Sequence, residues 1–219
     1  MTLLLGGGGD ADDERPILDR FLELTQDGTI AYWPVALDRA EYSAATAFAQ
    51  SALGRDISTW TRLEDHSPEE IADHAGVFIG GGNTYHLLNE IRRSGMVDSL
   101  RAFAVAGVLY GGSAGAIVCG ADIDTAAYFD ANEIGLADTT GLGLLGSYAV
   151  WCHFEDDHVD ALTGWVRARG HPVVALPERS GAEVAGVELS SIGRDPLFVV
   201  DRHGTFAEVV PGRIHSLVT

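Results

Sequence analysis

A serine stands at the centre of a glycine-rich turn midway along the chain. Residues 111–115 read Gly-Gly-Ser-Ala-Gly, between the apolar run of residues 107–110 and a second apolar segment. Small neighbours let the backbone turn sharply from a strand into a helix, and this turn exposes the hydroxyl of Ser113. The amide of Ala114 then lies at the helix start, where it can face an oxyanion. The pattern indicates a nucleophilic serine, although a serine that only caps a helix has the same local sequence.

A second glycine turn precedes the serine in the chain. Residues 80–84 read Gly-Gly-Gly-Asn-Thr and follow the short apolar run of residues 76–79. Glycines at a strand end let the backbone approach a substrate closely, and we expect Gly81, Gly82 and Asn83 to bind the oxyanion or the substrate. A phosphate cradle is the alternative. The chain has no lysine, so this turn is not a P-loop.

A serine nucleophile needs a base, which is usually a histidine. Of the eight histidines, His153 is the best placed because it follows the strand-like run of residues 148–152. His158 is its nearest rival. The stretch from His153 to His158 also contains three acids and resembles a metal cluster, but residues five apart on a helix diverge. We therefore expect a catalytic histidine here and not a metal site.

The base in turn needs an acid that orients it. Glu178 follows the apolar run of residues 173–176 and is our candidate for this role, with Asp130 and Glu183 as alternatives. Since carboxyl ends of parallel strands share one edge of a sheet, an acid that follows a strand can lie beside a histidine that follows another.

Charge and composition restrict the partners. The chain has 14 basic and 32 acidic residues, a formal net charge of -18, which would repel nucleic acid and anionic membranes. Residues 1–9 lack the basic and long apolar regions of a signal peptide. Cys119 and Cys152 are the two cysteines, too few for a disulfide framework. We expect a cytoplasmic protein in a reducing compartment.

The elements that must position these residues alternate between strands and helices, which predicts a parallel sheet covered on both faces within one domain, residues 1–219. Gly6–Gly9 is interpreted as a structural turn, and residues 135–146 as a mobile loop. Short strands near the C-terminus predict an antiparallel extension at the edge of the sheet. The predicted strands cover residues 2–5, 30–37, 57–60, 76–79, 107–110, 173–176, 183–187, 197–201 and 206–210, and the predicted helices 14–26, 39–53, 83–93 and 96–105, with further helix starts at residues 67 and 113.

Four segments, in this order, resemble the motifs of the peptidase E family of aspartyl dipeptidases and the related cyanophycinases. The segments are Gly80-Gly81-Gly82-Asn83-Thr84, Gly111-Gly112-Ser113-Ala114-Gly115-Ala116, His153-Phe154 and Leu176-Pro177-Glu178. The similarity covers most of residues 1–210. It implies a three-layer α/β sandwich like that of class I glutamine amidotransferases, with a mostly parallel central sheet. It also implies a Ser113–His153–Glu178 triad that hydrolyses small peptides through a covalent acyl-enzyme without a cofactor.

One segment departs from the family pattern. In aspartyl dipeptidases a loop with an arginine follows the catalytic histidine, whereas this chain has Glu155-Asp156-Asp157-His158 there. These carboxylates would repel an aspartyl side chain, so the substrate preference stays open, with Arg167, Arg169 and Arg179 as substitutes for the missing arginine. We expect a small peptide as substrate and no nucleic acid or membrane partner, and a homodimer is one possible assembly. An esterase or amidase, or a ligand-binding module without catalysis, are the alternative functions.

Overall fold

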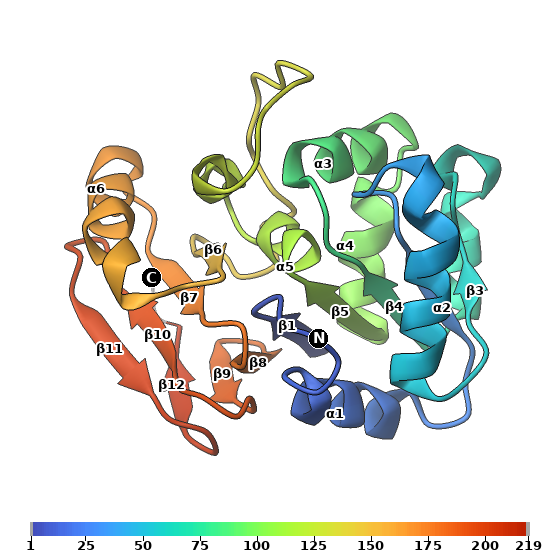
Figure 1. Ribbon diagram of the computed structural model, residues 1–219, viewed down its shortest axis with the longest axis horizontal. Helices are drawn as coiled ribbons and strands as arrows, with labels where there is room; N and C mark the ends of the chain where they lie inside the picture. Colours follow the sequence, from blue (N-terminus) through green and yellow to red (C-terminus); the bar gives the residue numbers. More distant parts are fainter. Residues whose placement is uncertain (1, 218–219) are drawn as a thin grey trace.

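The computed structural model describes residues 2–217, and its largest element is an eight-stranded sheet (Figure 1). In the order in which they lie side by side, the strands are β12 (Ile214–Ser216), β9 (Glu188–Ser191), β8 (Gly181–Ala185), β1 (Thr2–Gly6), β5 (Val108–Gly112), β4 (Gly76–Ile79), β2 (Ile30–Trp33) and β3 (Ser58–Thr59). The last five are parallel, and β8, β9 and β12 pair antiparallel beyond β1. The predicted parallel sheet with an antiparallel extension is thus confirmed.

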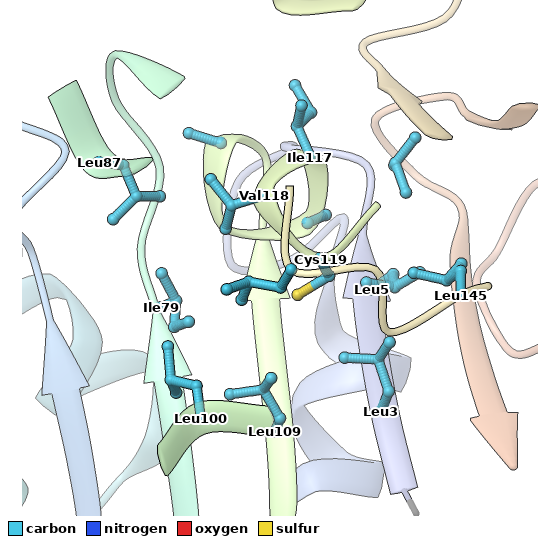
Figure 2. Close-up of a cluster of buried hydrophobic side chains, with 14 of the residues drawn as sticks. Leu3, Leu5, Ile79, Leu87, Leu100, Leu109, Ile117, Val118, Cys119 and Leu145 are labelled. Atoms are coloured by element: carbon cyan, nitrogen blue, oxygen red, sulfur yellow. The ribbon is translucent and has the colours of Figure 1, made fainter. Parts of the chain in front are cut away.

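Helices cover both faces of this sheet. Because side chains alternate along a strand, Leu4 of β1 packs with α1 and α2, whereas Leu3 and Leu5 pack with the helices of the opposite face. Figure 2 shows the second group, with Leu5 near Cys119 of α5 and Leu109 near Leu100 of α4. The helices are α1 (Arg15–Thr25) and α2 (Tyr42–Leu53) on one face, and α3 (Thr84–Arg93), α4 (Val97–Ala106) and α5 (Ala114–Cys119) on the other.

A second sheet of four strands is a feature that the sequence patterns did not predict. Its order is β11 (Phe206–Val209), β10 (Leu197–Val200), β7 (Val173–Leu176) and β6 (Ala149–Cys152), and α6 (Val159–Arg169) packs on one face. The strands expected at residues 173–176, 197–201 and 206–210 therefore do not extend the large sheet. The reason lies in burial: Trp151 faces α6, while Val150 and Cys152 join the core of the large sheet, so both faces of β6 are covered.

Several predicted elements are shorter in the structure. The second strand ends at Trp33 because Pro34 has no amide hydrogen to donate to a neighbouring strand. The helix predicted from Ser67 is a single short 3-10 segment. The 3-10 segments are η1 (Arg39–Glu41), η2 (Leu63–Asp65), η3 (Pro68–Asp73), η4 (Asp124–Tyr128) and η5 (Asp156–His158).

The loop of residues 135–146, predicted to be mobile, is tied to two helices. The guanidinium of Arg92 donates to the carbonyls of Asp138 and Thr140, and that of Arg101 donates to the carbonyl of Leu142. Its mobility stays a prediction. No helix within residues 2–217 is long and apolar enough to cross a membrane.

We predict that Gly115→Ala destabilises the fold, because a Cβ there would overlap the backbone carbonyl of Ile79, and a backbone group cannot move aside. Forced contacts of this kind cost about 1–3 kcal/mol. Gly164→Ala is the matched control: it lies exposed within α6 with no atom near its Cβ position, and it should stabilise by about 0.5–1 kcal/mol. Urea unfolding measures both; equal effects of the two substitutions would contradict the packing argument.

Candidate active site

Ser113 lies between β5 and α5, at the turn that the glycine pattern predicts. Its φ is 50°, a left-handed conformation that is uncommon for residues other than glycine. The turn depends on its small neighbours, because a Cβ on Gly111 would overlap the backbone of Gly115. The backbone N–H of Ser113 donates to the carbonyl of Gly6 at 3.2 Å, which fixes the turn to the end of β1.

His153 follows β6 and reaches the serine from the small sheet. Its Nε2 lies 2.9 Å from Oγ of Ser113. Its φ is 51°, and its backbone N–H donates to the carbonyl of Gly7 at 3.0 Å. The two residues thus share an unusual positive φ, and each donates its amide to one of two successive carbonyls at the end of β1. Such strain persists only where the surrounding structure holds it, and it is common at active sites.

Glu178 completes a chain of three contacting side chains. Its Oε1 lies 3.0 Å from Nδ1 of His153, in the turn after β7. A carboxylate at Nδ1 favours the tautomer with a proton there, which leaves Nε2 free to accept the serine proton. The other two candidate acids are engaged elsewhere: Glu183 pairs with Arg20 at 2.8 Å, and Asp130 accepts the amide of Thr84 at 2.8 Å.

The rival His158 has a structural environment. It is buried, its Nδ1 accepts the N–H of Glu155 at 3.1 Å, and its ring contacts Tyr128 and Trp151. The ligand atoms of Glu155, Asp157 and His158 all lie within 4.8 Å of one another. Two of the three are exposed carboxylates, which often cluster without an ion, so this group alone does not make a metal site.

Two predicted oxyanion donors, the amides of Gly81 and Ala114, lie beside the serine. A Cβ placed on Gly81 would be 3.3 Å from Cβ of Ser113 and 3.7 Å from Oγ, so the backbone of this glycine runs close to the hydroxyl. Within residues 2–217, the amides of Gly81, Gly82 and Ala114 have no hydrogen-bond partner. Amides without a partner near the nucleophile can donate to the negative oxygen of a tetrahedral intermediate.

Asn83 forms hydrogen bonds within the protein through its backbone and its side chain. Its amide donates to the carbonyl of Ala36 at 2.8 Å, so it is no longer available to an oxyanion. Its side-chain oxygen accepts the N–H of His86 as the N-cap of α3, and its Nδ2 donates to the carbonyl of Ala131. Capping and loop anchoring thus engage these groups of Asn83, and its role toward the oxyanion or the substrate stays a prediction.

Glu14 is a component of the site that the sequence reasoning missed. The carboxyl is buried; it accepts the hydroxyl of Tyr110 on one oxygen and the N–H of Gly8 on the other, at 2.9 Å. A Cβ on Gly8 would lie 2.6 Å from Nε2 of His153, so this backbone touches the imidazole. Residues 6–9 are thus a wall of the site and not only the structural turn that we predicted. Nothing in the local pattern distinguishes Glu14 from the neighbouring acids Asp10, Asp12 and Asp13.

We predict that ionisation of the buried Glu14 carboxyl lowers the free energy of unfolding, because burial raises the pKa of this carboxyl from 4.5 to about 7. Between these values the folded chain keeps the proton that the unfolded chain releases, so the free energy of unfolding should fall as pH rises. Glu14→Gln should remove up to roughly 1.4 kcal/mol per pH unit of this dependence. Urea unfolding from pH 5 to 7 measures it; parallel pH profiles of both proteins would contradict the prediction.

Comparison with known proteins agrees with this geometry. The model of Peptidase family S51 matches residues 2–192. Peptidase E of Shewanella sp. strain MR-4 is 30% identical over 183 residues, which cover 78% of this chain and 75% of that protein. Peptidase E of Shewanella sp. strain W3-18-1 is 28% identical over the same shares of the two chains.

Two solved structures share the fold. A peptidase from an acI-B1 Actinobacterium has a TM-score of 0.75 at 16% identity, covering 98% of this chain and 96% of that one. A Listeria monocytogenes protein, described as a candidate peptidase E, has a TM-score of 0.70 at 18% identity, with 88% and 98% covered. They support the three-layer α/β architecture that the resemblance to the peptidase E family implied. Since the family model matches most of its length, the chain belongs to peptidase family S51 and is a serine peptidase.

Proposed function

We propose that this peptidase cleaves small peptides through a covalent acyl-enzyme, with Ser113 as nucleophile, His153 as base and Glu178 as the acid that orients the base. The observation that carries the proposal is the pair of contacts of the imidazole, 2.9 Å to the Ser113 hydroxyl and 3.0 Å to the Glu178 carboxylate. Both distances are within the range for proton transfer between heavy atoms.

The reaction begins when Oγ of Ser113 attacks the carbonyl carbon of the peptide bond. The hydroxyl proton passes to Nε2 of His153, and the carbonyl oxygen becomes an oxyanion that the amides of Gly81 and Ala114 stabilise. The imidazolium then gives its proton to the amide nitrogen, the C–N bond breaks and the amine leaves. Removal of one oxyanion donor typically costs about 2.7–4 kcal/mol of transition-state stabilisation.

A water molecule completes the cycle. His153 takes a proton from this water, whose oxygen attacks the ester carbonyl of the acyl-enzyme. The imidazolium then returns a proton to Oγ of Ser113, and the carboxylic acid product leaves. Every proton is thus carried by one imidazole, which explains why its orientation by Glu178 matters in both halves of the reaction.

Removal of the nucleophile should abolish peptide hydrolysis and leave the fold intact. Ser113→Ala should lower kcat by about 10⁶-fold, as in serine peptidases whose nucleophile is removed. Ser51→Ala, at an exposed serine of α2, is the matched control and should keep full activity. Dipeptide hydrolysis and labelling by a small fluorophosphonate measure the effect. Retained turnover in Ser113→Ala would disprove the mechanism, and hydrolysis of esters without dipeptides would favour an esterase.

The acid of the triad can be tested against its closest sequence alternative. Glu178→Gln removes the charge beside Nδ1 of His153 and should lower kcat by about 10²–10⁴-fold, with little change in KM. Glu183→Gln is the matched control, because Glu183 pairs with Arg20 and not with the imidazole. It should leave kcat unchanged. Equal losses of kcat in the two variants would contradict the role of Glu178.

A further inference from the structure

A cavity of about 380 Å³ opens directly beside Ser113. Its floor is formed by the two glycine turns, at Gly80, Gly81 and Gly112, and by the buried carboxyl of Glu14. Its far wall is α2. The lining also includes Gly8, Leu37, Glu41, Ala44, Ala45 and Phe48.

The position of the cavity relative to the imidazole indicates which part of a substrate it would hold. The leaving amine must lie near His153, because it receives the proton from that ring. The acyl part of the substrate must therefore extend to the other side of Ser113. The cavity lining includes Ser113, Gly81 and Gly8, whose backbone lies beside the imidazole, but neither His153 nor Glu178. We assign the cavity to the acyl part because it contains the nucleophile and the oxyanion glycine without the imidazole itself.

The lining contains apolar side chains and two carboxyls but no basic residue among those the structure describes. The Glu14 carboxyl already accepts hydrogen bonds from Tyr110 and Gly8 on its two oxygens. One oxygen of Glu41 accepts the amide of Asp38. An aspartyl side chain here would be an anion among acids without a partner, which is strongly unfavourable.

The arginines that could replace the family's missing arginine do not enter this cavity. Arg169 pairs with Asp122 and Asp124, and Arg179 lies 3.7 Å from Asp13 and 3.6 Å from Asp195. None of Arg167, Arg169 and Arg179 is among the lining residues. Among the described residues, the lining of this cavity therefore offers no positive charge to an aspartyl side chain.

The wall formed by α2 offers an apolar surface instead. Phe48 is 51% exposed although it is a large aromatic residue, and it lines the cavity. The small side chains of Ala44 and Ala45 leave space beside it. An apolar substrate side chain in this space would cover Phe48 and contact Leu37, as in small-molecule sites that combine apolar walls with few polar groups.

We propose that this cavity binds an uncharged, apolar side chain of the residue whose carbonyl is attacked, so that the enzyme prefers leucyl or phenylalanyl peptides to aspartyl ones. The inference rests on the proposed function, because it takes Ser113 as the attacking group. In this inference the cavity between the glycine turns and α2 determines which substrates are preferred, and the acidic segment after His153 does not.

The test compares dipeptides that differ only in the first residue: Leu-Leu, Phe-Leu, Asp-Leu and Arg-Leu. We expect kcat/KM for Leu-Leu and Phe-Leu to exceed that for Asp-Leu by more than about 10²-fold, since discrimination by unpaired polar groups is large. Equal or better hydrolysis of Asp-Leu would overturn the proposal. A preference for Arg-Leu would also overturn it and would assign the cavity to a cationic side chain.

A substitution in the cavity tests whether the cavity itself causes the preference for an apolar first residue. Ala44→Trp fills space beside Phe48 from an exposed helix position and should lower kcat/KM for Phe-Leu at least about tenfold more than for Ala-Leu. Ala47→Trp, on the same helix outside the cavity, is the matched control and should change neither value. Equal losses for both substrates in Ala44→Trp would contradict the assignment. The wild-type comparison does not depend on the folding of either variant.

A fluorophosphonate separates failure of this inference from failure of the proposed function. Labelling of Ser113 in the wild type, together with a preference for Asp-Leu, would leave the mechanism intact and reject only the apolar cavity. Absence of both labelling and dipeptide hydrolysis would reject the mechanism itself. The inference is supported only when labelling, dipeptide hydrolysis and the apolar preference occur together.

Discussion

The end of β1 is the constraint on which the site depends. The carbonyl of Gly6 accepts the amide of Ser113, and the next carbonyl, of Gly7, accepts the amide of His153. Two adjacent peptide groups thus hold the nucleophile turn of the large sheet and the histidine turn of the small sheet. The 2.9 Å contact between Ser113 and His153 follows from this shared anchor.

This anchor also explains the composition around it. Gly8 touches the imidazole, so any side chain there would displace the base. Gly7 is confined by the carbonyl of Pro177, next to the acid Glu178. Beneath these glycines, the Glu14 carboxyl accepts the amide of Gly8 and keeps this stretch in place. Residues 6–9 pass between the Glu14 carboxyl, the His153 imidazole and the backbone of residues 177–178, where a side chain has no room. These four glycines are therefore a requirement of the catalytic geometry.

Much of the site could be predicted from the sequence because its parts follow strand ends. A parallel sheet brings the carboxyl ends of its strands to one edge, so Ser113, Gly81 and their turns were placed together by local patterns alone. The choice of Glu178 over Asp130 and Glu183 needed the structure. The local sequence does not separate the three acids, and only the long-range packing shows that Glu183 faces Arg20 and Asp130 faces the start of α3.

The second sheet and Glu14 could not be predicted for the same physical reason. Strand runs such as residues 197–200 carry no information on which neighbour they will pair with, and that choice is made by the cores on either side. Likewise, an acid beside other acids gives no sign that it will be buried. The amide of Asn83 looked available because the partner carbonyl, at Ala36, lies 47 positions away in the sequence.

The proposed catalytic residues belong to two separate sheets, since Ser113 follows β5 and His153 and Glu178 follow β6 and β7. The reacting atoms thus meet across a seam between two bodies packed through Val150, Cys152 and their neighbours. A displacement of about 1 Å in a reacting group can reduce a rate about 10²-fold. A substitution at that seam can therefore inactivate the enzyme while every reacting side chain is still present. Both folding and turnover thus limit which residues the seam tolerates.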